Sequence, residues 1–360
     1  MKYDYSIIVE DLLRWFQENA RVLPWREQKN PYYTWVSEIM LQQTRVEAVK
    51  EYFLRFIEEL PDVQELAKAE EGKLLKLWEG LGYYNRVKNM QKAAVQIMEQ
   101  HQGKLPADYE ELLRLKGIGT YTAGAIASIA YGIPVPAVDG NVLRVTKRLA
   151  ASYDDVSKVS VKKELETSLT QIMPKGHPGA FNQALMELGA IVCLPNGTPL
   201  CSKCPVQKYC QAYKKDIVME LPVKAKKKAR IIEERTVFLI EYQNQYILHQ
   251  RSRGGLLAGL WELPNIEGKY EEKQVWEFLR QLDLPVVKIQ QLGEAKHIFT
   301  HKEWHMLGYA VKVSDKEGKN GNQYRGLKKI VWADKEEIRE KYALPSAFRA
   351  YQKFIFLECV

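Results

Sequence analysis

The stretch from Leu115 to Arg148 constrains the fold most, and it reads LKGIGTYTAGAIASIAYGIPVPAVDGNVLRVTKR. Gly117 and Gly119 lie between apolar segments, and a helical run, a proline-rich loop and a lone acid, Asp139, follow. A glycine turn that leads into a helix lets backbone N–H groups approach a phosphate. The stretch therefore predicts a phosphate-backbone clamp joined to a carboxylate. An ordinary helix–helix turn followed by an N-cap aspartate is also consistent with these residues.

The composition is that of a globular chain with an anionic partner. A length of 360 residues suits about two to three domains, and a hydrophobic share of 46% supports real cores. The net charge of +8 fits nucleic acid or a membrane surface, between which charge alone does not choose. No apolar run is long enough to span a bilayer, and the N-terminus lacks the layout of a secretory signal. We expect a cytoplasmic protein.

Four of the five cysteines lie close together in the sequence, at Cys193, Cys201, Cys204 and Cys210. Such clustering in a cytoplasmic chain favours a metal site over disulfides. The fifth, Cys359, stands alone near the C-terminus and is interpreted as a bystander thiol.

Most of the sequence from Tyr5 to about Tyr213 has the apolar periodicity of helices joined by short loops. Thr34 or Ser37 is expected to cap a helix that runs to about Thr44. Later helices are predicted at Arg45–Ile57, Val63–Lys68, Glu71–Gly80, Asn85–Gln100, Tyr109–Leu115, Tyr121–Tyr131, Asn141–Ala150, Val161–Met173 and His177–Val192. The first part of the chain is therefore predicted to be all-α.

A lysine-rich segment at 216–234 separates this part from a different pattern. The segment is either a solvated tether or a DNA contact. After Thr236 the sequence alternates, and two strands are predicted around a turn at Gln243 and Asn244. Further strands at Val287–Gln291, Trp304–Val313 and Ile330–Ala333, with helices at Lys273–Leu282 and Lys335–Lys341, complete an α+β domain. The predicted domains are 1–215, a linker at 216–234, and 235–360.

The opening stretch resembles the helix-hairpin-helix DNA glycosylase superfamily, whose pattern is LPGhGxxTA followed by a loop and VDxxhxR. Leu115–Ala123 and Val138–Arg144 match this pattern, with Lys116 in place of the usual proline. The resemblance implies that Gly117 and Gly119 bind the DNA backbone, a contact that positions a protein without reading sequence.

The resemblance also assigns chemistry to two residues. It implies that Asp139 faces the sugar carbon from which the base departs and stabilises an oxocarbenium-like sugar. In bifunctional relatives such as endonuclease III, a lysine stands at the position of Tyr121 and forms a Schiff base with the sugar. A tyrosine has no amine for that adduct, so we expect base removal by water without efficient strand cleavage. Tyr121 is expected to support the carboxylate of Asp139.

A second carboxylate, Glu38, is the lone acid in the apolar segment PYYTWVSEIMLQQT. Apolar surroundings push a carboxyl group toward its neutral form, which suits a general acid near neutral pH. An exposed helix glutamate is the ordinary alternative. The segment closely resembles MutY-type adenine DNA glycosylases, in which the matching glutamate protonates the adenine and activates the water. Endonuclease III-like relatives lack this acid.

The same resemblance implies further DNA and base contacts. Gln42 and Gln43, expected to continue the helix of Glu38, would face the DNA from which adenine is flipped out. Tyr83 would wedge beside 8-oxoguanine. The remaining implied positions are Arg26, Asn141 and Gln183 around the adenine, and Leu41 and Leu81 beside the DNA-facing residues. Helix surface or structural hydrogen bonding is the alternative for each of them.

The cysteine spacing, Cys-x7-Cys-x2-Cys-x5-Cys, resembles the glycosylase iron–sulfur loop, usually Cys-x6-Cys-x2-Cys-x5-Cys. The resemblance implies a 4Fe–4S cluster held by the four thiolates, with structural zinc as the alternative. A turn at Pro195, Asn196 and Gly197 would absorb the extra residue of the first gap.

The segment Arg251–Asn265 resembles the start of the Nudix-like C-terminal domain of MutY proteins. The helix near Glu272–Gln281 lacks the paired acids that hold magnesium in Nudix hydrolases, so a recognition domain is expected. The family's 8-oxoguanine-sensing loop is Phe-Ser-His, and the matching residues here are Phe299, Thr300 and His301. An aromatic-anchored turn is the alternative for this loop. Three histidines, His297, His301 and His305, also lie at spacings compatible with either a metal site or alternate strand positions.

Together these features predict a multidomain protein with an all-α helix-hairpin-helix glycosylase domain and an α+β Nudix-like domain. The function implied is monofunctional removal of adenine paired with 8-oxoguanine or guanine in double-stranded DNA, by a monomer. Two alternatives are an endonuclease III-like glycosylase and lyase, and a non-catalytic DNA-binding protein.

Overall fold

The computed structural model describes residues 3–225, 229–316 and 329–356. Residues within it fall into two compact units. The helical unit is formed by Met1–Ala69 and Asn85–Lys226, and the sheet unit by Glu70–Tyr84 and Lys227–Val360. Cys359 lies outside the described residues, as do Lys226, Lys227 and Lys228 of the predicted linker.

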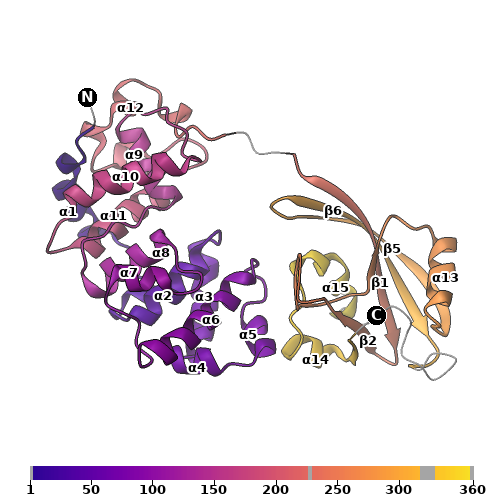
Figure 1. Cartoon of the computed structure of the whole chain (residues 1–360). Helices are drawn as coiled ribbons and strands as arrows, with labels where there is room; N and C mark the ends of the chain where they lie inside the picture. The colour runs from indigo at the N-terminus through magenta and orange to yellow at the C-terminus, as the bar shows by residue number, and fades with distance from the viewer. Residues whose placement is uncertain (1–2, 226–228, 317–328, 357–360) are drawn as a thin grey trace. The chain divides into compact units, whose positions relative to one another are not determined.

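The helical unit confirms the all-α prediction (Figure 1). Its elements are η1 (Tyr5–Ile8), α1 (Val9–Asn19), η2 (Pro24–Arg26), α2 (Pro31–Leu41), α3 (Val46–Glu59), α4 (Val63–Lys68), α6 (Asn85–Gln100), α7 (Tyr109–Arg114), α8 (Thr120–Ala125), the π-helical turn η3 (Ile126–Ala130), α9 (Gly140–Leu149), α10 (Val159–Ile172), α11 (Pro178–Ile191), η4 (Cys201–Lys203), η5 (Gln207–Tyr209), α12 (Gln211–Lys214) and η6 (Val218–Glu220). None of the helices in the described ranges is long and apolar enough to cross a bilayer.

Helix α2 begins and ends at residues other than those predicted. Its N-cap is Asn30, whose side chain accepts hydrogen bonds from the N–H groups of Tyr32 and Tyr33, and Pro31 occupies the first turn. The prediction of a Thr34 or Ser37 cap is therefore wrong, since Asn is a favoured cap and Pro is favoured directly after it. The helix ends at Leu41, before both glutamines.

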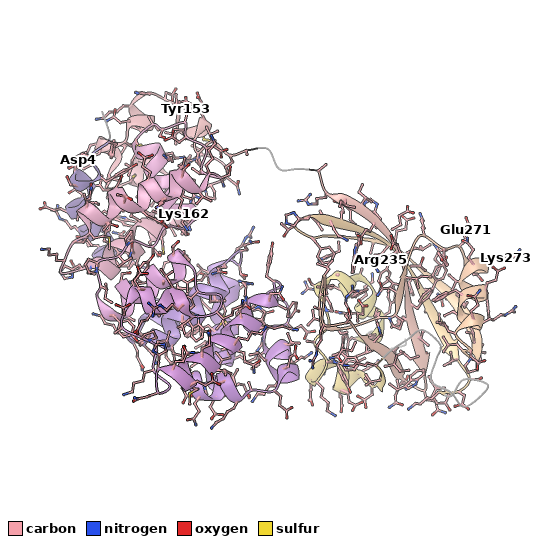
Figure 2. All side chains as sticks on the ribbon, in the orientation of Figure 1. Asp4, Tyr153, Lys162, Arg235, Glu271 and Lys273 are labelled. Carbon is pink, nitrogen blue, oxygen red and sulfur yellow. The ribbon has the colours of Figure 1, made fainter. Side chains whose placement is uncertain are left out.

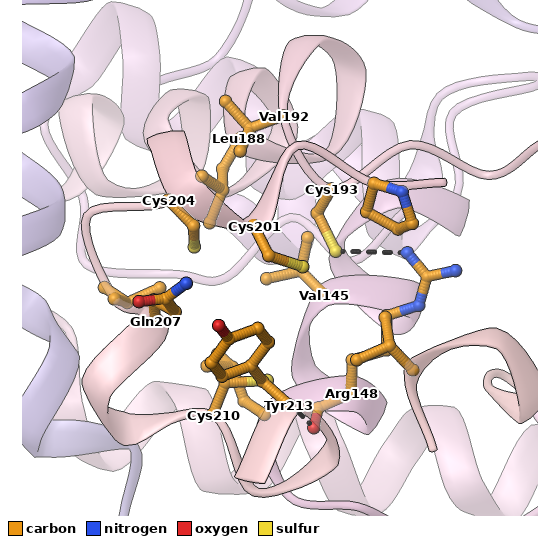
Figure 3. Close-up of a pocket in the computed structure, with 14 residues that line it drawn as sticks. Val145, Arg148, Leu188, Val192, Cys193, Cys201, Cys204, Gln207, Cys210 and Tyr213 are labelled. Carbon is orange, nitrogen blue, oxygen red and sulfur yellow. Dashed lines mark hydrogen bonds between the residues drawn. The ribbon is translucent and has the colours of Figure 1, made fainter. Parts of the chain in front are cut away.

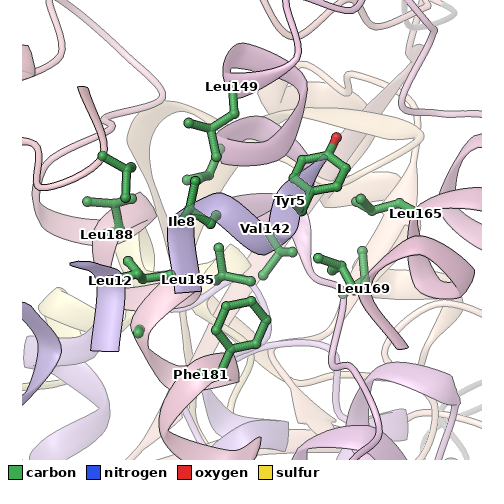
Figure 4. Packing of buried hydrophobic residues seen from close by; sticks show 14 of the residues in the cluster. Tyr5, Ile8, Leu12, Val142, Leu149, Leu165, Leu169, Phe181, Leu185 and Leu188 are labelled. Atoms are coloured by element: carbon green, nitrogen blue, oxygen red, sulfur yellow. The ribbon is translucent and has the colours of Figure 1, made fainter. Parts of the chain in front are cut away.

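A buried apolar cluster unites the two ends of the helical unit's sequence. Ile8 and Leu12 pack with Val142 of α9 and with Phe181 and Leu185 of α11 (Figure 4). Helix α11 thus contacts both α1 and α9. This core fixes the start of α9, where Asp139 lies, against α11.

The sheet unit contains, among the described residues, one seven-stranded sheet of order β3-β2-β1-β6-β5, with β4 on β1 and β7 on β2. Strands β1 and β6 are parallel, and the other pairs are antiparallel. The strands are β1 (Ile231–Tyr242), β2 (Gln245–Gln250), β3 (Trp261–Glu262), β4 (Asn265–Glu267), β5 (Val286–Ile298), β6 (Lys302–Val313) and β7 (Ile330–Ala333). The predicted turn at Gln243 and Asn244 is confirmed, and both residues have positive φ, as a two-residue hairpin requires.

Helices cover both faces of this sheet (Figure 1). Helix α13 (Glu272–Gln281) packs through Val275 and Leu279 in one apolar cluster. Helices α14 (Lys335–Glu340) and α15 (Arg349–Phe356), with the turn η7 (Ser346–Phe348), contribute to the other. Strands β3 and β4 and helix α15 lie outside the predicted elements.

The segment Glu70–Tyr84, which carries α5 (Glu71–Leu77), is anchored to the sheet unit by hydrogen bonds. Lys76 Nζ donates to the carbonyl groups of Ile338 and Tyr342 at 3.1 and 3.2 Å. The backbone N–H of Leu344 donates to Glu79 Oε1 at 2.7 Å. Tyr83, at the end of this segment, therefore belongs to the same unit as the Nudix-like strands.

Candidate active site

Glu38 is buried on α2, with an exposed fraction of 7%. Its neighbours in the helix, including Trp35, Val36, Ile39 and Met40, are buried too. The exposed-helix alternative for this acid is therefore wrong. The hydroxyl of Tyr121, at the start of α8, donates a hydrogen bond to Glu38 Oε2.

Burial raises the pKa of Glu38 from 4.5 to about 7. The hydrogen bond from Tyr121 and the charge of Arg26 oppose the rise in pKa, whereas the charge of Asp139 adds to it. Burial and the charges of Glu38 and Asp139 also raise the pKa of Tyr121, so its hydroxyl keeps its proton and acts as a donor. A carboxyl group with a pKa near 7 can give up and take back a proton at neutral pH.

Asp139 is the N-cap of α9, so the structural interpretation of this residue holds. Its Oδ1 accepts from the N–H of Val142 at 2.8 Å, and its Oδ2 accepts from Asn141 Nδ2 at 2.7 Å. Burial raises the pKa of Asp139, although these hydrogen bonds and the charge of Arg144 oppose it. The cap fixes the orientation of this carboxylate, whose charge also acts on Glu38.

Tyr121 donates its hydrogen bond to the carboxylate of Glu38, whereas the sequence linked it to Asp139. Its hydroxyl contacts Glu38 and lies 3.8 Å from Met186 Sδ, while Asp139 is held by Val142 and Asn141. The hydroxyl group of Tyr121 reaches Glu38 because α8 packs against α2, which carries Glu38. Support of Asp139 by Tyr121 stays a prediction.

Asn141 connects Asp139 to the cysteine segment. Its Oδ1 accepts from Arg144 Nη2 at 2.9 Å, and Arg144 Nε donates to the carbonyl of Cys193 at 2.8 Å. Arg144 Nη2 also donates to the carbonyl of Gly189 at 2.8 Å. Asn141 is thus engaged in orienting Asp139.

Helix α11 contacts the Glu38–Tyr121 pair through Met186, whose Sδ lies 3.8 Å from the hydroxyl of Tyr121. Gln183, Met186 and Glu187 are spaced three and four residues apart, which places them on one helix face. Gln183 Nε2 donates to Gly179 O of its own helix at 3.3 Å. Glu187 is fully buried and binds Arg26 and Arg21. The signal that identified Glu38, a lone acid in an apolar helix, was equally present at Glu187.

The two glycines of the clamp have different structural requirements. Gly117 has φ +80°, and a Cβ there would lie 2.7 Å from Asn89 Cβ, so both conformation and space require glycine. Gly119 is the N-cap of α8 and would place a Cβ in open space. The open side of Gly119 lies at the helix start, where Lys162 (Figure 2) donates to Thr120 Oγ1 at 3.2 Å.

Gln42 and Gln43 leave the helix of Glu38, so the prediction that they continue it is wrong. Arg86 Nη1 donates to the carbonyl groups of Ile39 and Gln42 at 2.5 and 2.7 Å and thereby caps the end of α2. Gln42 Nε2 lies 3.5 Å from Thr122 Oγ1, and Gln43 is exposed with φ +66°. Leu41, the last helical residue, is half-buried. Arg86 was missed because its partners are distant in sequence.

The sheet unit brings together two residues that the resemblance linked to the opposite base. Tyr83 is exposed with φ +48°, and its hydroxyl lies 2.9 Å from Thr300 Oγ1. Leu81 is buried, with 6% exposure.

Phe299, Thr300 and His301 form the turn between β5 and β6. The Phe299 ring packs edge-on against Trp304, with the ring centres 4.9 Å apart. The Phe299 N–H donates to Lys302 O at 2.8 Å, and Thr300 and His301 are exposed. The loop therefore forms an aromatic-anchored turn and leaves Thr300 exposed.

The four clustered cysteines line one cavity (Figure 3). All four are free thiols, and Val145, Leu188 and Val192 form part of the apolar wall around them. Arg148 Nη1 lies 3.3 Å from Cys193 Sγ. Among the described residues, no three His, Cys, Asp or Glu side chains are grouped closely enough to hold a single metal ion, and this includes the histidines of the sheet unit.

Comparisons with known proteins agree with this geometry. Residues 36–171 match the HhH-GPD superfamily of base excision DNA repair proteins, and residues 236–353 match the NUDIX domain. The chain is 33% identical to the adenine DNA glycosylase of Mus musculus, over 97% of this chain and 78% of the relative. It is 35% identical to the adenine DNA glycosylase of Buchnera aphidicola subsp. Schizaphis graminum, over 84% of this chain and 87% of the relative.

A solved structure extends the likeness to the fold. A non-covalent complex of endonuclease III with DNA has 26% identity and a TM-score of 0.52, and the match covers 60% of this chain and 99% of that one. The helical fold is thus shared with endonuclease III, whereas the full-length relatives also share the Nudix-like part. The chain belongs to the adenine DNA glycosylase family.

Proposed function

We propose that this base-excision repair enzyme hydrolyses the N-glycosidic bond of adenine paired with 8-oxoguanine or guanine, with Glu38 as the general acid. The observation that carries the proposal is the buried Glu38, whose pKa of about 7 leaves about half of it protonated at neutral pH. The shared family supports the DNA substrate and the adenine target.

Glu38 would protonate the flipped adenine and make it a better leaving group. The carboxylate formed would then take a proton from the attacking water, since a pKa near 7 suits both directions of transfer. Tyr121 would hold Oε2 of this carboxylate through both steps. The products are free adenine and an abasic site.

Asp139 would stabilise positive charge on the sugar as the base leaves. Its two oxygens already accept hydrogen bonds from Val142 and Asn141, so the group needs little reorganisation at the transition state. Gly117 and Gly119 would hold the DNA backbone nearby, and Arg26, Gln183 and Asn141 would surround the base pocket. Leu41, Gln42 and Gln43 would lie on the DNA side of it.

Tyr121 supports the monofunctional reaction because the enzyme has a phenol where a lyase has an amine. Single-turnover release of adenine from duplexes with A:8-oxoguanine, A:G and A:T pairs tests the function. We expect release in the first two and none in the third. A borohydride-trapped adduct on pyrimidine-lesion DNA would favour the endonuclease III-like alternative, and binding without release would favour the non-catalytic one.

Tyr83 and the turn Phe299, Thr300 and His301 would read 8-oxoguanine. The 2.9 Å contact between the hydroxyl groups of Tyr83 and Thr300 supports a shared hydrogen-bonding site. Thr300→Ala should therefore reduce the ratio of the A:8-oxoguanine rate to the A:G rate by about tenfold, the cost of one hydrogen bond. Thr300→Ser is the matched control and should preserve the ratio. An unchanged ratio in Thr300→Ala would remove this turn from base reading.

Cys193, Cys201, Cys204 and Cys210 would hold a 4Fe–4S cluster. Their four thiols line one cavity without converging on a single point, which supports a cluster, whose irons each take a separate thiolate, over one zinc ion. Such a cluster would supply structural support for the loop. Iron and acid-labile sulfide analysis tests this assignment, and zinc in their place would contradict it.

The proposal includes the domain organisation, the oligomeric state and the location of the protein. Domains at 1–215 and 235–360 would be joined by the basic linker at 216–234 and act as a monomer on DNA in the cytoplasm. The net charge of +8 supports binding to the DNA backbone. Sedimentation of the free protein tests the monomer.

A further inference from the structure

Glu187 on α11 is a buried acid that holds two arginines. Its side chain is 1% exposed. Oε1 accepts from Arg21 Nε at 2.6 Å and from the Arg21 backbone N–H at 3.2 Å. Oε2 accepts from Arg21 Nη2 and from Arg26 Nη2, both at 3.0 Å. Both oxygens of the carboxylate are therefore committed to this pair of arginines.

Arg26 is fixed from several directions at once. Its backbone lies in η2, where Pro24 restricts the chain. Its Nη1 donates to Arg21 O at 3.2 Å, and its guanidinium lies 5.5 Å from the centre of the Phe16 ring. Glu187 supplies the ionic contact to Nη2, the only carboxylate paired with Arg26 among the described residues. A planar guanidinium held in this way has a defined orientation.

Glu187 is also close, along its own helix, to a residue that contacts Tyr121. Gln183 is one turn earlier on the same face of α11, and the adjacent Met186 contacts the hydroxyl of Tyr121. Tyr121 in turn binds Glu38. The positive charge of Arg26 lowers the pKa of Glu38, so the guanidinium that Glu187 holds acts on the proposed acid.

We infer that Glu187 is a positioning residue for adenine excision: it orients Arg26 toward the base pocket and contributes to the reaction through Arg26. Arg21 shares the carboxylate and binds both of its oxygens. Loss of the Glu187 charge frees the guanidinium of Arg26, which then samples orientations that do not serve the base. The inference rests on the proposed assignment of the pocket around Glu38.

A double-mutant cycle of Glu187→Gln and Arg26→Gln tests the inference, with single-turnover adenine release from an A:8-oxoguanine duplex as the readout. Each single variant should slow release by about 10- to 100-fold, the size of a charged hydrogen-bonded contact. The double variant should be no more than about twofold slower than Arg26→Gln, because Glu187 acts through that residue. Multiplying effects would overturn the inference.

Two further variants separate positioning from folding. Glu187→Asp keeps the charge and should recover most of the rate lost in Glu187→Gln. If Glu187→Gln does not fold, the two arginine variants still decide, because Arg26→Gln should slow release far more than Arg21→Gln, and equal losses would overturn the inference. Arg21→Gln removes the other cation on the same carboxylate and should stay within about threefold of the wild-type rate, since one ion pair carries only part of such a network. A loss in Arg21→Gln equal to that in Glu187→Gln would reduce the cluster to a structural ion pair. Glu38→Gln separates the two proposals, because full activity there overturns the proposed function whatever Glu187 does.

Discussion

Glu38 on α2 and Glu187 on α11 are lone acids in apolar helices, and both side chains are almost fully buried. Their electrostatic surroundings are opposite. Glu38 has a tyrosine hydroxyl as its hydrogen-bond donor, and burial raises its pKa to about 7. Burial also acts to raise the pKa of Glu187, but hydrogen bonds and charges from Arg21 and Arg26 outweigh it and lower the pKa.

The difference shows that hydrogen-bond donors and neighbouring charges, rather than burial, decide whether a buried glutamate is protonated or ionised. A neutral donor leaves Glu38 able to exchange a proton, which is what base protonation needs. Two cations keep Glu187 ionised, which suits an anchor. In the proposed mechanism, α2 supplies the acid, and α11 supplies the fixed charge that holds Arg26.

Glu38→Gln is predicted to have the largest effect on the rate of adenine release. Adenine release should fall by about 10²- to 10⁴-fold, because the proton donor is lost. The free energy of unfolding should rise by about 3 kcal/mol at pH 8, because the wild type must bury a charge there. The raised pKa means that wild-type stability falls as pH rises from 4.5 to about 7, so the gain should vanish below pH 4.5. Guanidinium unfolding across pH measures this.

The exposed Glu58 on α3 provides the matched control for that variant. Glu58→Gln should leave the rate of adenine release unchanged. A rate for Glu38→Gln within threefold of the wild-type rate would contradict the assignment of the acid.

Glu187→Gln should have a stability effect of the opposite sign. At pH 7 the variant should lose about 3 kcal/mol, because the two arginines lose their buried partner. The lowered pKa means that this stabilisation is present above 4.5 and is lost as pH falls through the folded-state pKa. The deficit should therefore shrink in acid, and the same unfolding series records it. Equal free energies of unfolding for the variant and the wild type at pH 7 would mean that the ion pairs do not stabilise the fold.

The smallest predicted effect is on Tyr121→Phe. The Tyr121 hydrogen bond lowers the pKa of Glu38, so its removal should raise that pKa further above 7. The alkaline fall of the adenine-release rate should move upward by about one pH unit, the value of one charged hydrogen bond. Rates measured between pH 6 and pH 9 test this, and a downward move would contradict the observed donor.

Much of the helical fold follows from local signals. Asn85–Gln100 has the apolar period of a helix and forms α6 with the predicted bounds, and Gln243 and Asn244 make the turn between β1 and β2. Local signals did not predict the residue at which α2 ends, because Arg86 caps this helix from a distant part of the chain. Strand β3, with two residues, depends entirely on pairing with β2.

The sequence predicted those features of the candidate site that depend only on a residue's neighbours along the chain. The apolar neighbours of Glu38 predicted its burial, and the N-cap position of Asp139 followed from its place before α9. The partner of Tyr121 was not predictable, since the packing of α8 against α2 decides it. Glu187 carried the same signal as Glu38, but its arginines come from another part of the chain.

The contrast between the two acids is tested most directly by a ¹³C NMR titration of the glutamate carboxyl groups. Glu38→Gln and Glu187→Gln assign the two signals by their disappearance. The signal lost in Glu38→Gln should titrate near pH 7, and the one lost in Glu187→Gln should titrate below 4.5. A Glu38 signal that titrates at 4.5 or below would contradict the account, because the acid would then be ionised at neutral pH and unable to protonate the base.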